Sequence, residues 1–227
     1  MPDIIGLTLL ARLGRRSIHK LIVAGLTGGL VAAALPVRAV EESGASQFVA
    51  GLGDKVVGIL KEQGLSAADR QTKFKTLFVS AFDAAAIARF VLGRHWKELS
   101  DNRRPKFMET FTEYVAALYA TQFSQYQGQT LKVTGSKAVG EGDTEVDSVI
   151  KQPNNPTALN VQFRVRQSDG GYKVIDVAVN NVSLIITKRS EFNSIIQSEG
   201  IDGLEKRMHE ALTRVKGASL KVDRHLG

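Results

Sequence analysis

The spacing of apolar residues changes twice along this chain, and this pattern limits the fold more than any other feature of the sequence. Up to Gly128 the apolar residues recur every three or four positions, which is the period of an α-helix. Between residues 131 and 179 they alternate, as in a half-buried strand, and the helical period returns from Ser190 onward. A chain ordered as helices, then consecutive strands, then helices is expected to fold as an α+β domain.

The clearest helical signal covers residues 101–126, where one stripe of apolar side chains follows the i, i+4, i+7 rule. Shorter helices are predicted over 47–63, 66–81 and 83–93, and Ser66 has the position of a capping residue. The strand region is expected to form a four-stranded antiparallel meander, because turn residues separate its four alternating segments. Those segments are residues 131–135, 144–150, 159–166 and 172–179.

Two closing helices are predicted over 190–196 and 201–215, with Gly200 between them. Residues 216–227 show no regular period, and we expect them to form a disordered tail. Neither a repeat nor a long linker interrupts residues 40–215, which therefore read as one domain.

The N-terminal residues have the three parts of a secretory signal peptide. A basic segment is followed by an uncharged apolar run over 21–35, and Val37 and Ala39 hold the −3 and −1 positions. We expect residues 1–39 to be removed and the remaining chain to reach the periplasm. An uncleaved membrane anchor is the alternative, although fifteen residues span only about 22 Å of a hydrocarbon core of roughly 30 Å. The Arg15–Arg16 pair resembles a twin-arginine signal, so the export route stays open.

The net charge of +7 is distributed unevenly between the signal segment and the rest of the chain. Residues 1–39 carry +4, and the other 188 residues, with 25 basic and 22 acidic side chains, carry +3. A domain so near neutrality does not have the electrostatic field that nucleic-acid binding requires. The chain has no cysteine, which excludes disulfides, thiol catalysis and thiolate metal sites.

Catalytic patterns are equally scarce in the sequence. The histidines after residue 39 are His95, His209 and His225, and none has a second histidine at i+3 or i+4 that would indicate a metal site. There is neither a Gly-x-Ser-x-Gly elbow nor a glycine-rich phosphate loop in the mature part. Residues 143–147 place Asp, Glu and Asp on alternate positions, which is typical of the solvated side of a strand. We therefore expect no enzymatic activity, no cofactor and no metal.

The remaining feature is the apolar face of the predicted sheet. It could be an ordinary core packed against helices, or it could line a cavity for an apolar ligand, and periodicity does not separate the two. The residues of this face are Leu159, Val161, Phe163, Val165, Ile175, Val177 and Val179.

The segment from Phe82 to Trp96 resembles the signature of the MlaC family, periplasmic phospholipid-binding proteins also called toluene-tolerance auxiliary components. The resemblance covers about residues 45–212 in the family's order and spacing. His95 stands where the family often has an aromatic residue, and Asn181 where it usually has glycine. The further matching segments are residues 107–128, 170–177, 182–184, 189–192 and 200–204.

This resemblance implies helices packed around a curved four-stranded antiparallel sheet that encloses an apolar cavity. It also implies a monomeric phospholipid shuttle between an outer-membrane MlaA-type complex and the inner-membrane MlaFEDB-type transporter, which maintains outer-membrane lipid asymmetry. On this basis the residues predicted to bind lipid are Phe82, Ile87, Val91, Phe111, Tyr114, Leu118, Phe163, Val165, Ile175, Val177, Val182 and Leu184.

Three alternatives remain at this point. A carrier of the same fold could bind a hopanoid, as in the related HpnM branch. An enzyme on this fold could use Asp176 or His95 as a base, although Asp176 points away from Ile175 and Val177 and suits a structural hydrogen bond better. A structural adaptor would carry no ligand and would have a filled interior.

Overall fold

The computed structural model describes residues 43–123, 126–140, 142–153, 155–168 and 170–223. The predicted signal peptide, residues 1–39, lies outside this part of the chain. In the described residues, no helix combines the length and the apolar character needed to cross a membrane.

The helices begin where the sequence offers a side chain that can cap them. Ser43 accepts a hydrogen bond from the Ser46 backbone N–H at 3.2 Å, and Ser66 accepts one from Asp69 at 3.0 Å, which confirms its predicted capping role. Asp83 caps the next helix in the same way. The helical elements are α2 (Gly44–Lys61), α3 (Ala67–Ala81), α4 (Ala84–Leu92), the 3₁₀ helix η1 (Gly93–Glu98), α5 (Arg103–Phe123) and α6 (Leu184–Asp223).

The strands form one open antiparallel sheet in sequence order, which confirms the α+β prediction. One detail differs: a fifth strand of two residues, too short to leave a periodic signal, follows the four that were predicted. The strands are β1 (Thr130–Ala138), β2 (Asp143–Gln152), β3 (Asn155–Ser168), β4 (Gly171–Val179) and β5 (Val182–Ser183).

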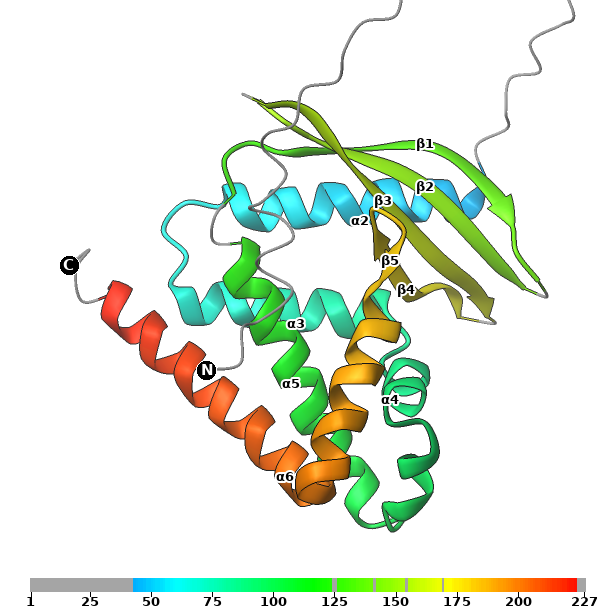
Figure 1. The fold of residues 1–227 in the computed structure, drawn as a ribbon. Coiled ribbons are helices and arrows are strands. Elements are labelled where there is room, and N and C mark those ends of the chain that lie inside the picture. The colour runs from blue at the N-terminus through cyan, green and yellow to red at the C-terminus, as the bar shows by residue number, and fades with distance from the viewer. Residues whose placement is uncertain (1–42, 124–125, 141, 154, 169, 224–227) are drawn as a thin grey trace, which may run out of the picture. The chain divides into compact units, whose positions relative to one another are not determined.

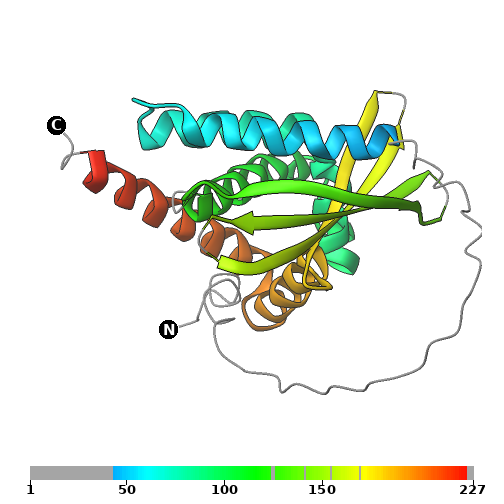
Figure 2. The same ribbon diagram turned by 90° about the horizontal axis from the view of Figure 1, so that it is seen from above.

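Register decides which side chains share a face of the sheet. Phe163 on β3 pairs with Val146 on β2 and with Val177 on β4, so these three lie on the same side. We call this side the inner face, because α2 packs against it along β1. Figure 1 shows α2 crossing beneath the strands and α3 below α2, with α6 beginning directly below β5 and its second half lying further from the sheet. Seen from above, α2 runs alongside β1 (Figure 2).

Two groups of buried residues stabilise the fold. The sheet core joins α2 and the end of α3 to the inner face, and it consists of Ala45, Val49, Leu52, Ala81, Val146, Val165 and Val174. The helical core joins α4, η1, α5 and α6, and it consists of Ile87, Ala88, Val91, Leu92, Leu99, Phe107, Phe111, Phe192, Ile196, Leu204 and Met208.

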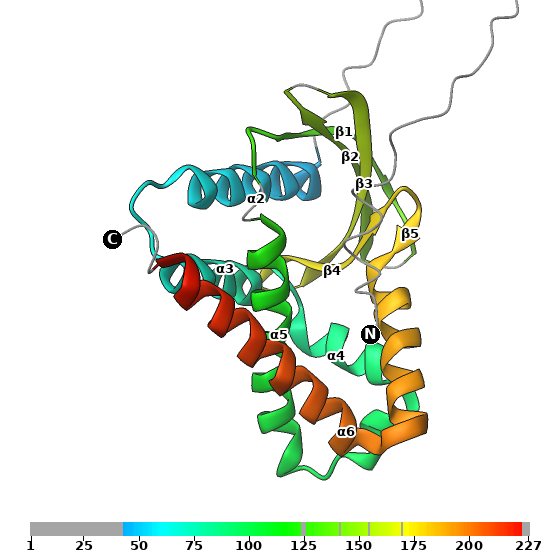
Figure 3. The ribbon, with the colours of Figure 1, turned by 60° about the vertical axis from the view of Figure 1, so that its left-hand side comes forward.

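Helix α6 is broken where the sequence predicts a break. Gly200 has φ of 72° and ψ of 179°, a conformation that favours glycine, and Figure 3 shows the bend between the two halves. The helix also begins earlier than predicted, because Ser183 accepts a hydrogen bond from the Ile186 N–H. It continues to Asp223, where we expected residues 216–227 to form a disordered tail, and residues 224–227 lie outside the described part.

Candidate functional site

The central strand of the sheet has an inner face that the helices cover incompletely. On β3, Val161 and Val165 are buried, but Phe163 between them is only half-buried. On β4, Val177 and Val179 are half-buried as well. Side chains on the inner side of a central strand are normally buried when helices close over them. The inner face therefore presents apolar surface that the protein's own side chains do not fully cover.

A second partly exposed apolar surface belongs to α5. This helix packs mainly on α3, α4 and α6 rather than on the sheet. Its side chains Tyr114, Leu118 and Tyr119 are half-buried. Tyr119 lies close enough to Asp176 on β4 for the carboxylate to act on its phenol. This end of the surface on α5 therefore lies near β4.

A lysine at the start of α6 lies between these elements. The Lys188 Nζ donates to Glu191 at 2.6 Å and to the Tyr114 hydroxyl at 3.5 Å. It also lies 5.7 Å from the ring centre of Tyr114 and 5.9 Å from that of Phe192. Burial by itself would lower the pKa of Lys188, but the oxygens of Tyr114 and Glu191 outweigh it and raise that pKa. The ammonium thus stays charged in a largely apolar surrounding.

Tyr119 extends this group of polar side chains toward β4. Burial raises the pKa of its phenol, Lys188 acts in the opposite direction, and Tyr114 and Asp176 add to the rise. We call Tyr114, Tyr119, Asp176, Lys188 and Glu191 the polar junction, because Tyr114 and Glu191 raise the pKa of Lys188, and Tyr114, Lys188 and Asp176 all act on the pKa of Tyr119.

Sequence reasoning missed the polar junction. Lys188 stands in a stretch of mixed polar and charged residues that resembles any solvated helix surface. Its partner Tyr114 is 74 residues away, so only the tertiary fold brings the two together.

Asp176, one of the two bases considered in the enzyme alternative, makes structural hydrogen bonds. Its carboxylate accepts from the Ser183 hydroxyl at 2.7 Å and from the Ile185 backbone N–H at 3.4 Å. These bonds join β4 to β5 and to the first turn of α6. This agrees with the structural role that its position on the strand indicated.

His95, the other candidate base, is buried between η1 and α6. Its Nδ1 lies 2.8 Å from Glu98 Oε1, and its Nε2 lies 3.3 Å from Asn193 Oδ1. The Nδ1 contact lies within η1, and the Nε2 contact joins η1 to α6. In the described residues, no group of three or more histidines and carboxylates is placed to hold a metal ion.

The twelve residues predicted to bind lipid divide by their burial, and their contact with lipid stays a prediction. Val165 belongs to the sheet core, and Val182 is 46 % exposed at the surface. Those in the closed helical core are Ile87, Val91 and Phe111. Those that are half-buried are Phe82, Tyr114, Leu118, Phe163, Ile175, Val177 and Leu184.

The acidic residues of β2 differ from the solvated strand face that the sequence indicated. Asp143 is buried, because the register places it opposite Arg166. Arg166 donates to it at 2.8 Å and Arg164 at 2.9 Å. The hydrogen bond from Arg166, supported by Arg164 and opposed by burial, lowers the pKa of Asp143. The prediction of a solvated carboxylate is therefore wrong at this position.

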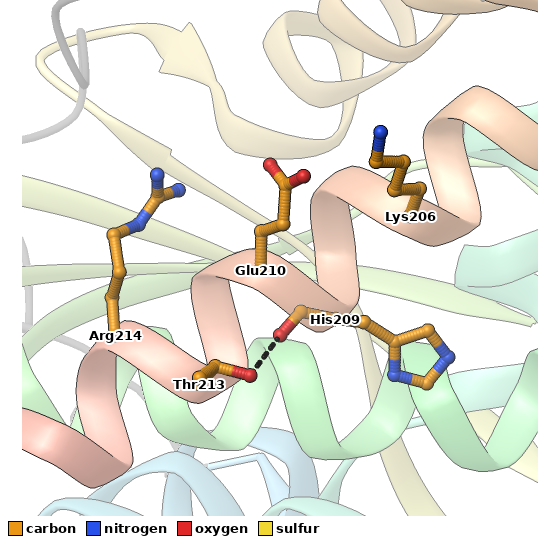
Figure 4. Close-up of a pocket in the computed structure, with 5 residues that line it drawn as sticks. All are labelled: Lys206, His209, Glu210, Thr213 and Arg214. Atoms are coloured by element: carbon orange, nitrogen blue, oxygen red, sulfur yellow. Dashed lines mark hydrogen bonds between the residues drawn. The ribbon is translucent and has the colours of Figure 1, made fainter.

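A shallow depression of about 430 Å³ lies on the C-terminal half of α6. All of its lining residues come from this one helix, and His209 is exposed, as its charged neighbours predicted. In Figure 4 the Lys206, Glu210 and Arg214 side chains extend to one side and His209 to the other. The polar groups do not converge, and we assign no site to this depression.

The model of the MlaC protein family matches residues 51–210. This chain belongs to the MlaC family. This match confirms the resemblance that was found in the sequence.

Two relatives are informative for this MlaC family member. It is 28 % identical over 127 residues to the intermembrane phospholipid transport system binding protein MlaC of Haemophilus influenzae. That match covers 55 % of this chain and 59 % of the relative, so the chain spans less than two thirds of the relative's length. The fold matches that of a phospholipid-binding protein from Ralstonia solanacearum, solved with a phospholipid, with a TM-score of 0.64 and 21 % identity. This match covers 75 % of this chain and 97 % of the Ralstonia chain.

Proposed function

We propose that this protein is a periplasmic phospholipid carrier that holds the acyl chains against the inner face of the sheet. It moves lipid between an outer-membrane MlaA-type complex and the inner-membrane MlaFEDB-type transporter, and so maintains outer-membrane lipid asymmetry. The observation that carries the proposal is the half-buried state of Phe163, Val177 and Val179 on the two middle strands. Family membership and the names of the two relatives support the same ligand class.

The physical need for a carrier follows from the hydrophobic effect. Each methylene exposed to water costs about 0.8 kcal/mol, so two chains of sixteen carbons represent on the order of 20 kcal/mol. A lipid therefore leaves a bilayer at a useful rate only when a protein covers its chains. In return, the lipid would cover apolar surface on β3, β4 and α5 that the fold leaves partly exposed.

Carriage of this kind requires no covalent chemistry. Asp176 and His95, the two bases considered above, are engaged in hydrogen bonds that join elements of the fold. We therefore propose a binding function without turnover, for a chain exported to the periplasm by residues 1–39.

The direct test is to produce the full chain in bacteria, purify it from the periplasm and analyse it by native mass spectrometry. We expect a protein mass increased by one phospholipid, and extraction should yield the same lipid. Recovery of a hopanoid would instead favour the polycyclic alternative. A folded protein that carries no lipid and takes none from liposomes would overturn the proposal.

A matched pair of variants locates the binding surface. Phe163→Asp places a charge on the inner face, whereas Asn160→Asp places the same charge at an exposed position of the same strand. We expect Phe163→Asp to lose bound lipid and Asn160→Asp to retain it, with both folds checked by circular dichroism. Equal retention by two folded variants would exclude the inner face as the binding surface.

A further inference from the structure

We propose that the polar junction binds the phosphate of the lipid, with Lys188 as the charged anchor and with Tyr114 and Tyr119 as additional donors. This inference rests on the proposed function and specifies which part of the ligand is recognised. It assigns a dedicated charged site to a ligand whose acyl chains need only apolar surface.

The donors of the polar junction converge from separate elements. Lys188 comes from α6 and Tyr114 from α5, and their Nζ and hydroxyl oxygen lie 3.5 Å apart. The rings of Tyr114 and Phe192 flank the ammonium at 5.7 and 5.9 Å and so limit its movement. An ammonium has three protons to donate, and a phosphate oxygen is a strong acceptor for them.

Glu191 already accepts a hydrogen bond from Lys188 at 2.6 Å. The Glu191 side chain is 47 % exposed and the Lys188 side chain 26 %. An ion pair three residues apart on a helix is weak when its carboxylate is exposed, because water solvates that carboxylate nearly as well. Glu191 can therefore turn to solvent when a phosphate approaches, whereas Lys188 is held by the aromatic rings.

The tyrosines add neutral donors beside the ammonium. A phenol hydroxyl is protonated at neutral pH and can donate to a phosphate oxygen. The nearby Asp176 carboxylate would repel a phosphate, but its charge is partly balanced by the donors Ser183 and Ile185. The junction thus combines one ammonium with two hydroxyls, which together suit a phosphodiester.

Lys188 also lies close to elements that present apolar surface. It stands near the start of α6, the helix that follows β5 directly and packs on β4. Its partner Tyr114 lies one helical turn from Leu118 on α5, and both are half-buried. A phosphate at Lys188 would therefore leave the acyl chains of the same lipid within reach of α5 and β4.

The test compares two lipids that differ only in the head group. Binding of phosphatidylglycerol and of diacylglycerol with identical acyl chains is measured for the full chain and for Lys188→Met, which keeps the apolar stem. We expect Lys188→Met to weaken phosphatidylglycerol binding about tenfold and diacylglycerol binding less than twofold. Lys188→Arg should restore most of the difference. Lys73→Met, which removes an exposed lysine paired with Glu62, is the matched control and should change neither.

The outcomes separate this inference from the proposed function. A parent protein that binds neither lipid overturns the proposed function. A parent protein that binds both, with Lys188→Met unchanged or weakened equally for both, overturns the role of Lys188 in phosphate binding. If Lys188→Met does not fold, Lys188→Gln and Lys188→Arg provide the same comparison, with the charge removed in one and kept in the other. Tyr119→Phe should weaken only phosphatidylglycerol binding, by about threefold.

Discussion

The helical core and the inner face of the sheet use the same kinds of side chain but are closed to different degrees. In the helical core, Phe107, Phe111 and Phe192 are each at most 1 % exposed. Their rings contact one another, with centres 6.1 Å apart for Phe107 and Phe111 and 6.3 Å for Phe111 and Phe192. Phe163, on the central strand, is only half-buried. The helical core is therefore closed at these rings, while the central strand keeps part of its apolar surface available.

This division has a physical reason. A closed core is packed as densely as a crystal of small molecules, so a ligand could enter it only by displacing side chains. Surface that is already half-exposed can be covered by a ligand without that cost. The stable part of the fold can therefore remain unchanged whether or not the inner face is occupied.

The largest expected effect comes from truncating one aromatic ring in each region. Phe111→Ala removes a fully buried ring and should lower the free energy of unfolding by about 3–5 kcal/mol. Phe163→Ala should lower it by only about 1–2 kcal/mol, because its ring is already partly in water. Urea unfolding of the lipid-free proteins measures both values. Equal losses would show that the inner face is as closed as the helical core.

The same pair also illustrates how far sequence reasoning reaches. Periodicity identified the helices, the strands and the inward side of β3, because burial imposes a period on the residues of one element. The family resemblance assigned Phe111 and Phe163 alike to lipid binding, and periodicity could not separate them, since a period shows which side of an element faces inward but not what covers it. The role of Lys188 depends on a contact between α5 and α6, and no local pattern encodes such a contact.

An effect of intermediate size is expected on the outer face of the sheet, where Asp143 is held by Arg164 and Arg166. Asp143→Asn should lower the free energy of unfolding at pH 7 by about 1–2 kcal/mol, since both guanidinium groups are half-exposed and solvent screens the pair. A carboxyl group whose pKa is lowered in the folded state stabilises it above the ordinary pKa, roughly 4. This stabilisation is lost as the pH falls below that value.

Unfolding measured between pH 7 and pH 3 checks this assignment. The difference between the parent protein and Asp143→Asn should shrink as the pH decreases below about 4. Lys137→Met, which removes a more exposed ion pair with Glu145 on the same outer face, is the control and should have a smaller effect. A difference that stays constant over this range would mean that Asp143 acts through its shape rather than its charge.

The smallest expected effect concerns a hydroxyl on the inner face itself. Ser148 is 3 % exposed, and its Oγ has no hydrogen-bond partner among the residues that the structure describes. A buried hydroxyl without a partner is unfavourable by about 1–3 kcal/mol relative to one that is bonded. Ser148→Ala should therefore leave the free energy of unfolding unchanged or raise it by up to about 1 kcal/mol, the reverse of the loss expected for a paired group. A clear loss of stability in urea would mean that the hydroxyl makes a favourable contact, and the inner face would then resemble the well-satisfied helical core.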